Sequence, residues 1–400
     1  MAAHNPQKIW NKHSEQWRDP ASVINQNESF PSIDHNLLQC EISGNLWNVL
    51  EKLNIRLLIS REYEHLLIAL GVSKKSSEVS YMSLPHPSGI AVDRTKNIVH
   101  IASTRNPNQV YSFSPVNNFI SRTDIKFENK ITSSDHSTLM PAQLRFYPGS
   151  LYIHDLAMIG RKLCANAVGH NAVVELLDHG HYKYLWWPKC AEKNNKPRTD
   201  ANYLQLNSIA SGKSISDSFF SASTDTCSSI RPGHMDFKVD GRGVIFSGKT
   251  REVICRGLTR PHSARLYQNK IWVDNSGYGE FGYVEGQKFH PIIKLPGWTR
   301  GLAFFNGIAF IGTSRVLPKF THYAPGLNVE KSICAIHALE LQSGKILGSI
   351  EWPLGNQIFA IDWIPSKVSK GFIFDYLPKK RTEHIKHLAY SFSKHTRRKV

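Results

Sequence analysis

The sequence contains no apolar run long enough to cross a membrane as a helix, which takes about 18 consecutive apolar residues. Its N-terminal stretch, MAAHNPQKIWNKHSEQWRDP, is polar and lacks the apolar centre of a secretory signal. We therefore expect neither a transmembrane segment nor a secretory leader, and we predict a cytoplasmic protein.

Cysteine is scarce and scattered. The six cysteines form no CxxC pair, the spacing that is typical of zinc modules and of redox motifs. We therefore expect free thiols in a reducing compartment and no cysteine-based zinc module. Cys164 lies within an apolar stretch and is expected to be a core residue rather than a nucleophile.

Several motifs of common protein classes are also missing. No GxSxG elbow occurs, and the GYG triplet at 277–279 is too short for a phosphate-binding loop and precedes no predicted helix. The net charge is +17, which would attract anionic partners. Part of this charge lies in clusters at 379–381 and 394–399, and no specific nucleic-acid module is recognisable, so a basic solvated surface is the simpler interpretation.

The most informative stretch is residues 84–113, LPHPSGIAVDRTKNIVHIASTRNPNQVYSF. A Pro-rich start leads into three short apolar segments at 90–92, 98–102 and 110–113, which are separated by polar turns. Short apolar runs bounded by turn residues predict a meander of antiparallel strands.

Similar units recur along the chain. Their starts are marked by His86, His154, Asn207, His262, Thr299 and Ile358, with the copies at Asn207 and Ile358 weaker than the others. Successive markers are separated by between 37 residues (His262 to Thr299) and 68 residues (His86 to His154). A propeller blade takes roughly 40–50 residues, so the long intervals contain insertions, for which 114–148 and 188–199 are the candidates.

The repeats predict an all-β fold, a six- or seven-bladed β-propeller with short terminal extensions. We place a polar arm at 1–45, the propeller at 46–376 and a basic tail at 377–400, with short helices at 7–17 and 383–390. The apolar hairpin at 55–70 either closes the ring, which would remove exposed sheet edges, or forms a blade of its own. The sequence leaves the number of blades open.

Histidines stand where the innermost strands are expected to begin. They are His86, His154 and His262, with His170 on the adjoining elbow of the second blade. Matched positions of a repeat lie at one radius, so these imidazoles are predicted to meet at one mouth of the channel and to hold a divalent metal such as zinc, iron or calcium. Asp155 and Asp274 would then orient the rings by accepting hydrogen bonds. The simpler alternative is that each histidine caps its strand.

Arginines occupy neighbouring repeat positions. Arg265 and Arg300 are expected to hold a carboxylate or phosphate by paired hydrogen bonds, and solvent exposure is the alternative. Arg105 and Arg315 lie at similar elbows. The pair His179 and His181 is a weaker metal candidate, because it stands on a Gly-containing turn.

The unit at 84–113 resembles a blade of the NHL type, whose pattern is a proline, a small residue, an apolar run, a polar turn and a strand that ends near an asparagine. The span from about residue 57 to 363 resembles a bacterial family of conserved hypothetical proteins of about this length. The resemblance is carried by PHPSGIAVD, SLYIHDLAMIGRKLCANAVGHNAVVEL, LTRPHSARLYQNKIWVDNSGYGEFG and LPGWTRGLAFFNGIAFIGTSR. It implies a propeller and no particular activity.

Two functions follow as hypotheses. The first is an enzyme that acts on a small or peptidic anionic substrate at the channel mouth. In that enzyme His86, His154, His170 and His262 hold the metal, or act as acid and base, while Arg300 and Arg265 position the substrate. The second is a non-catalytic propeller that presents its loop face to a protein partner.

Overall fold

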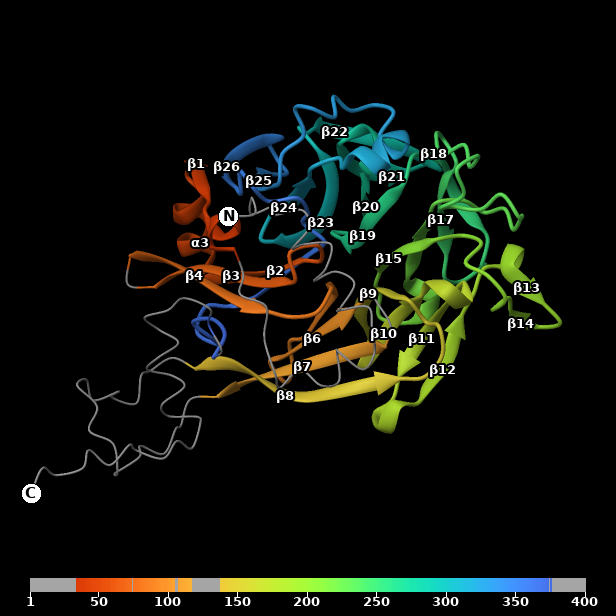
Figure 1. The fold of residues 1–400 in the computed structure, drawn as a ribbon, viewed down its shortest axis with the longest axis horizontal. Helices are drawn as coiled ribbons and strands as arrows, with labels where there is room; N and C mark the ends of the chain where they lie inside the picture. The colour runs from red at the N-terminus through yellow and green to blue at the C-terminus, as the bar shows by residue number, and fades with distance from the viewer. Residues whose placement is uncertain (1–33, 74, 105–106, 117–136, 374, 376–400) are drawn as a thin grey trace, which may run out of the picture.

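The computed structural model describes residues 34–373 and 375, apart from 74, 105–106 and 117–136. The two predicted terminal helices, most of both terminal extensions, Arg105 and part of the insertion at 114–148 lie outside the described residues. Strands dominate the part that the structure describes, and they form six large sheets arranged around a central axis (Figure 1). The protein is therefore a six-bladed β-propeller, which decides the number that the sequence left open.

Each blade runs from an innermost strand on the axis to an outermost strand on the rim, and neighbouring strands are antiparallel. The first three sheets are β27(Ala360–Pro365)-β2(Ile55–Arg61)-β3(Leu66–Ser73)-β4(Ser76–Ser83), β5(Pro87–Asp93)-β6(Ile98–Ser103)-β7(Asn108–Val116)-β8(Thr138–Tyr147) and β9(Ile153–Ile159)-β10(Lys162–Ala167)-β11(Ala172–Leu176)-β12(Tyr182–Trp186).

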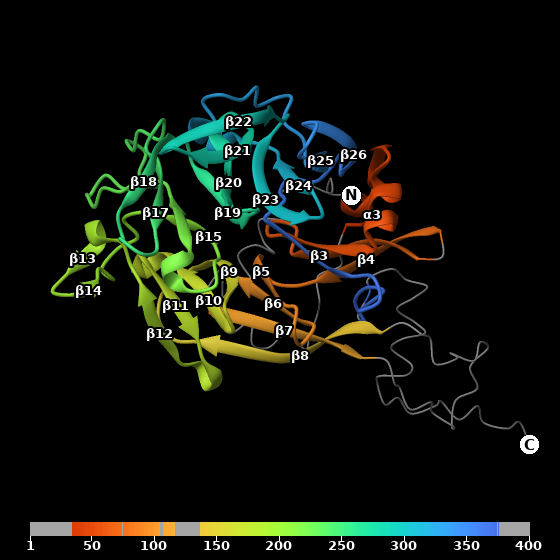
Figure 2. The same ribbon diagram turned by 180° about the vertical axis from the view of Figure 1, so that it is seen from behind.

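The other three sheets complete the ring, as the view from behind also shows (Figure 2). They are β15(Leu206–Ala210)-β16(Phe219–Ala222)-β17(Gly243–Ser247)-β18(Val253–Leu258), β19(Pro261–Tyr267)-β20(Lys270–Asn275)-β21(Glu280–Glu285)-β22(Lys288–Lys294) and β23(Trp298–Phe305)-β24(Ile308–Ser314)-β25(Ala335–Glu340)-β26(Lys345–Glu351)-β1(Glu41–Gly44).

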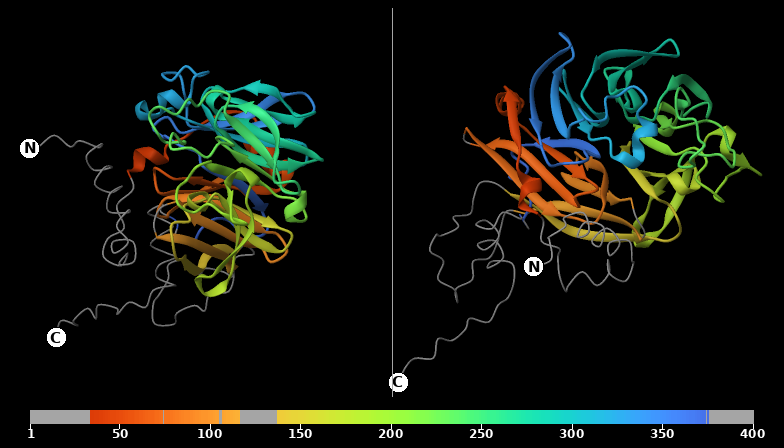
Figure 3. Two further views of the ribbon diagram at one scale, coloured as in Figure 1. Left: turned by 90° about the vertical axis from the view of Figure 1, so that its right-hand side faces the viewer. Right: turned by 45° about the horizontal axis from the view of Figure 1, so that its top comes forward.

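The ring is closed twice. The C-terminal strand β27 is the innermost strand of the blade whose other strands, β2 to β4, come from the N-terminal part, so the hairpin predicted at 55–70 does close the ring. In addition, β1 pairs with β26 as a fifth, outermost strand of the last blade. Residues 41–44 therefore belong to a blade, although the sequence suggested a loose arm up to 45. Figure 3 shows the blue C-terminal part against the red and orange N-terminal strands.

The remaining elements are short. The helix α3(Leu46–Leu53) buries Leu46 and Leu50 and contacts both β3 and β26, so it bridges the two blades where the ring closes. It ends at Asn54, which adopts the left-handed conformation that is favoured at helix C-termini. The others are η1(His35–Leu38), η2(Val168–His170), η3(Asp178–Gly180), η4(Lys189–Ala191), η5(Ile215–Asp217), η6(Ser276–Tyr278), η7(Pro318–Tyr323) and the small hairpin β13(Glu192–Lys193)-β14(Lys196–Pro197).

Burial changes from the axis to the rim and explains which strands the sequence revealed. Every residue of β2 is buried, because neighbouring blades cover both faces of its sheet. By contrast, β22 on the rim is largely exposed, although its sequence KFHPIIK contains three apolar side chains. The strand β8 has the same character, with an irregular burial pattern, so the sequence analysis missed it and treated its residues as part of the insertion at 114–148.

Candidate functional site

The innermost strands do not run smoothly along the channel. Where β5, β9, β15, β19 and β23 begin, the pairing with the second strand of the blade shifts register. Such β-bulges insert an unpaired residue and turn its side chain away from the regular alternation. The bulges therefore direct side chains from several blades into the channel at the same level, which we call the near end.

A small chamber lies at this level. It is lined by His154, Asp155, Asn207, Ser208, His262, Ser263, Arg265, Arg300, Phe359 and Ala360. Its free volume is about 10 Å³, roughly what one water molecule needs. The chamber thus brings together His154, His262 and Arg300, three of the residues that the sequence proposed for the site, from three different blades.

His154 has a defined tautomer. Its Nδ1 lies 2.9 Å from the backbone oxygen of Asn207, and its Nε2 lies 3.0 Å from Nη2 of Arg300. A carbonyl oxygen can only accept, and a guanidinium can only donate. His154 therefore carries its proton on Nδ1, is neutral, and uses its Nε2 lone pair to accept from Arg300.

His262 is oriented in the same way but leaves its other nitrogen available. Its Nδ1 lies 2.8 Å from the backbone oxygen of Arg260 and 3.1 Å from the Ser276 hydroxyl, which itself donates to the Thr299 carbonyl. The ring proton thus sits on Nδ1, and within the described part of the chain Nε2 has no hydrogen-bond partner. Burial lowers the pKa of His262 well below its usual value, and the positive charge of Arg300 lowers it further. The imidazole is consequently neutral.

Arg300 is a buried cation whose surroundings only partly compensate its charge. Its guanidinium lies 3.4 Å from the ring centre of Phe359, and its side chain is 8% exposed. Burial lowers the pKa of Arg300 to about 10, while the charge of Glu62 acts in the opposite direction. Arg300 therefore remains charged near neutral pH, but no described carboxylate forms an ion pair with it.

A second guanidinium lies close by. Arg260 precedes β19 and is near enough to Arg300 for its charge to disfavour protonation of Arg300. Its Nη1 donates a hydrogen bond to the Ser223 hydroxyl, and its guanidinium carbon lies 4.5 Å from the ring centre of Tyr323. Its buried Nε has no hydrogen-bond partner among the described residues. Burial lowers the pKa of Arg260 as well. Two like charges held together at low solvent exposure create a strong positive potential at the near end.

In the structure, His86 does not occupy the same position of the repeat as His154 and His262, although the sequence predicted that it would. Pro87, Ile153 and Pro261 occupy the same position, because each pairs at the first residue of an innermost strand. His86 therefore corresponds to Arg260, and Ser88 corresponds to His262, so the shared Pro-His dipeptide suggested a register that is wrong by two residues. The rings of His86 and His65 pack together with their centres 4.3 Å apart, and Nδ1 of His86 lies 3.9 Å from Oε1 of Glu62.

His170 does not join the other histidines. It lies in η2, next to the outermost strand β12, and its Nδ1 is 2.9 Å from the hydroxyl of Tyr184. Burial lowers the pKa of His170. Residues His179 and His181 are exposed at and beside the η3 turn. Across the described ranges, no group of three or more His, Cys, Asp or Glu side chains is arranged to hold a metal ion. A metal at this site stays a prediction from the sequence.

The two aspartates do not orient the imidazoles as predicted. Backbone carbonyls do so, while Asp155 forms an ion pair with Arg265 at 2.9 Å and accepts hydrogen bonds from the backbone of Leu156 and Ile209. Asp274 is fully buried beside His262, and burial raises its pKa well above the usual value. Arg315 likewise has a structural role, because it donates to the carbonyls of Gly355 and Pro353.

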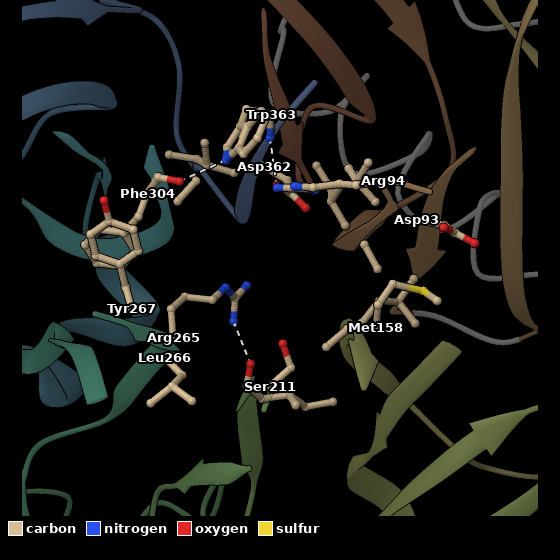
Figure 4. Close-up of a pocket in the computed structure, with 18 of the residues that line it drawn as sticks. Asp93, Arg94, Met158, Ser211, Arg265, Leu266, Tyr267, Phe304, Asp362 and Trp363 are labelled. Carbon is tan, nitrogen blue, oxygen red and sulfur yellow. Dashed lines mark hydrogen bonds and ion pairs between the residues drawn. The ribbon is translucent and has the colours of Figure 1, made fainter. Parts of the chain in front are cut away.

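A much larger cavity occupies the other end of the channel, where the innermost strands end. We call it the wide cavity; its volume is about 630 Å³ and all six innermost strands contribute to it (Figure 4). Arg265 lines both cavities, so its ion pair with Asp155 stands between them. No motif in the sequence predicted this cavity.

The sequence also missed Arg260. Tyr152, Gln205 and Arg260 each precede a repeat marker by two residues, and all three have a positive φ. A correct alignment of the repeats would have revealed this as a turn position that faces the near end. The residues of the wide cavity carried no such signal, because they continue the apolar pattern of the strands.

These observations define a six-bladed propeller whose channel holds a histidine–arginine chamber at one end and a wide cavity at the other. The sequence matches the family described as "Domain of unknown function (DUF4915)" over residues 44–372, which is most of the chain. The protein therefore belongs to that family. A comparison with curated proteins found no match. Among the described residues, no helix is long and apolar enough to span a membrane.

Solved structures show similar folds at low sequence identity. The nidogen/laminin complex has 8% identity and a TM-score of 0.49, covering 78% of this chain and 99% of that chain. Dihydro-heme d1 dehydrogenase NirN has 10% identity and a TM-score of 0.42, covering 79% and 76%. A gluconolactonase from Xanthomonas campestris has 11% identity and a TM-score of 0.40, covering 68% and 77%. Similarity at this level says nothing about the ligand of this chain.

Proposed function

We propose that this protein is an enzyme that binds a small organic anion at the near end of the channel and transfers a proton to or from it. Arg300 and Arg260 hold the carboxylate or phosphate of the substrate. His262 accepts a hydrogen bond or a proton from the substrate at Nε2. His154 holds Arg300 in place through the hydrogen bond between them.

The observation that supports this proposal most directly is that Arg300 and Arg260 have no ion-pair partner among the residues that the structure describes. Removing a charged group from water costs free energy unless an opposite charge or several hydrogen bonds compensate it. Within the described ranges, Arg300 has one neutral nitrogen acceptor and Arg260 has one hydroxyl acceptor, although each guanidinium carries five N–H donors. A bound anion would use these remaining donors and compensate both charges.

The histidine supplies the reactive group. A neutral imidazole with a free lone pair beside two fixed cations is suited to accept a proton from a substrate whose anionic group those cations hold. The bound anion would also stabilise the protonated imidazole, because it places a negative charge near His262. The chamber itself admits only a group of about the size of water, so the body of the substrate would lie toward the mouth.

Thermal unfolding with inorganic phosphate as the probe tests the binding step. Phosphate at constant ionic strength should raise the Tm of the parent protein in a saturable way, because a ligand that binds only the folded state stabilises it. Arg300→Gln and Arg260→Gln should each weaken this response at least about tenfold, whereas exposed Arg242→Gln should leave it unchanged. Equal responses in the parent and the Arg300 variant would contradict the proposal.

The chemical step needs a separate measurement. The protein is incubated in D₂O with hydroxy, keto and phosphorylated carboxylic acids, and deuterium incorporation or turnover is followed by NMR. Activity should disappear in His262→Ala while the phosphate response remains. Phosphate binding without turnover of any of these acids would favour the non-catalytic propeller over the enzyme.

A further inference from the structure

The wide cavity has the dimensions of a small-molecule site. Its volume of about 630 Å³ lies within the roughly 300–1,000 Å³ that is usual for ligand pockets. Because its walls come from the innermost strands of all six blades, the shape is fixed by the ring and not by one mobile loop. Figure 4 shows the guanidinium of Arg265 pointing into this cavity.

Arg265 uses only one edge of its guanidinium. Nη1 and Nη2 bind the two carboxylate oxygens of Asp155 at 2.9 and 3.4 Å, and Nη1 also reaches the carbonyls of Ile209 and Ala264. Nε has no hydrogen-bond partner within the described ranges. The edge formed by Nε and the second proton of Nη2 therefore remains available, and this edge matches the two oxygens of a carboxylate.

The charge of the cavity also favours an acid. Its lining contains four cationic side chains and two carboxylates; they are Arg94, Lys96, Arg161, Arg265, Asp93 and Asp362. Asp155, outside the lining, is the partner of Arg265, so the excess is one positive charge. Arg94 is paired with Asp362 at 2.6 Å, and Lys96 lies 3.9 Å from Asp93. Arg161 forms no ion pair in the part of the chain that the structure describes.

The walls between these charges are apolar or aromatic. Leu156, Leu302 and Ile361 line the interior, and on one side Tyr267 and Phe304 are stacked with their ring centres 4.7 Å apart. Such walls stabilise a ligand by removing apolar surface from water, and flat rings pack well against them. A small polar anion alone would leave most of this surface unused.

We propose that the wide cavity binds a small organic acid whose apolar or aromatic body rests on these walls and whose carboxylate binds the free edge of Arg265. The proposal does not depend on the function assigned to the near end. The two sites lie on opposite sides of the Asp155–Arg265 ion pair, and they use different guanidiniums for their ligands.

The test compares 1-naphthylacetate with the neutral 1-naphthylacetamide by isothermal titration calorimetry. The acid should bind about tenfold more tightly than the amide, the factor expected for one charge-assisted bidentate contact. In Ser211→Phe, a ring at the cavity wall should weaken binding of both compounds at least about tenfold by filling the space. The matched control Ser216→Phe places the same ring at an exposed position in η5 and should bind as the parent does.

A third variant isolates the carboxylate contact. Arg265→Gln should remove the preference for the acid over the amide, and circular dichroism together with cooperative urea unfolding verifies that it is folded. If Arg265→Gln does not fold, the Ser211 pair and the acid-to-amide ratio of the parent decide the question. Equal affinity for acid and amide, or unchanged binding in Ser211→Phe, would overturn the proposal. Loss of phosphate binding in Arg300→Gln with naphthylacetate binding intact would separate the two sites.

Discussion

Arg300 and His154 form a hydrogen bond across the full width of the channel. Their strands, β23 and β9, are three blades apart in a ring of six and therefore face each other. The bond from Arg300 Nη2 to His154 Nε2 is 3.0 Å long. Asp155, the next residue of β9, forms an ion pair with Arg265 of β19. Two consecutive residues of β9 thus anchor two arginines from other blades, and these contacts narrow the channel between its two cavities.

The first prediction concerns the tautomer of His154. Because Nδ1 donates to the Asn207 carbonyl and Nε2 accepts from Arg300, we expect a neutral ring with its proton on Nδ1 near neutral pH. Long-range ¹H–¹⁵N correlation spectra should show a protonated Nδ1 and an unprotonated Nε2. Arg300→Met removes the donor and should give a mixture of tautomers. A proton found on Nε2 in the parent would rule out the donor role of Arg300.

The second prediction concerns acid stability and rests on two buried histidines far from the channel contacts. His100 faces the Ser112 hydroxyl at 2.8 Å, and His337 faces the Ser349 hydroxyl at 2.8 Å, each directly across a strand pair. Burial lowers the pKa of both His100 and His337 from 6.5 to about 4. In the unfolded chain these groups take up protons below about pH 6.5, whereas in the folded protein they do so only near pH 4.

Stability should consequently fall as the pH decreases from 6.5 toward 4. Each histidine would account for up to about 2 kcal/mol between pH 6.5 and pH 5, because one pKa unit corresponds to about 1.4 kcal/mol. Urea unfolding at pH 7 and pH 5 measures this difference. It should be smaller in His100→Gln and His337→Gln than in the parent, and unaffected in exposed His181→Gln. The same loss in all four proteins would contradict the assignment.

Most of the fold could be predicted from the sequence because the innermost strands are buried on both faces. Their apolar runs repeat with recognisable starts, and the six markers fall within two residues of the first residue of β5, β9, β15, β19, β23 and β27. Rim strands such as β8 and β22 pair with one strand only and face solvent at their outer edge. Polar residues are therefore tolerated in them, and their hydrophobic pattern is weaker. Strand β1 was missed for the same reason, since all four of its residues are exposed and it is held by its pairing with β26.

The near-end site could be predicted from the sequence only in part, for a different reason. Side-chain direction at the near end is set by bulges, which insert one residue and leave no mark in composition. The Pro-His dipeptides at His86 and His262 therefore looked equivalent although their strands begin at Pro87 and Pro261, on opposite sides of the histidine. The convergence of His154, His262 and Arg300 followed from the repeat alone, whereas the role of Arg260 required the backbone geometry.

A third prediction addresses the closure of the ring. Arg56 is buried on β2, where Nη2 binds Glu78 at 2.7 Å and Nε donates to the Ser369 carbonyl beyond β27. Glu78→Gln leaves this cation without its carboxylate and should cost about 2–3 kcal/mol of unfolding free energy. Glu285→Gln removes a carboxylate from the solvent-exposed pair with Lys270 and should cost less than about 1 kcal/mol. Similar costs for both variants in urea unfolding would show that the Arg56–Glu78 ion pair contributes no more to stability than an exposed pair.

The last prediction tests whether close packing of two innermost strands positions the chamber. Gly89 lies in the bulge of β5, where an added Cβ would stand 2.4 Å from the backbone nitrogen of Leu156 and 2.6 Å from Cα of Asp155. Gly89→Ala must therefore displace β9 and with it His154. We expect a loss of about 3 kcal/mol or more in unfolding free energy.

The phosphate response at the near end should weaken in the same variant, because His154 can no longer hold Arg300 in its present position. Gly257→Ala is the matched control. Its backbone φ of +82° disfavours alanine, but no atom lies within 4 Å of the added Cβ, so only backbone strain of about 1 kcal/mol is expected. Comparable losses in the two variants, with phosphate binding retained in Gly89→Ala, would mean that the contact between β5 and β9 does not set the geometry of the chamber.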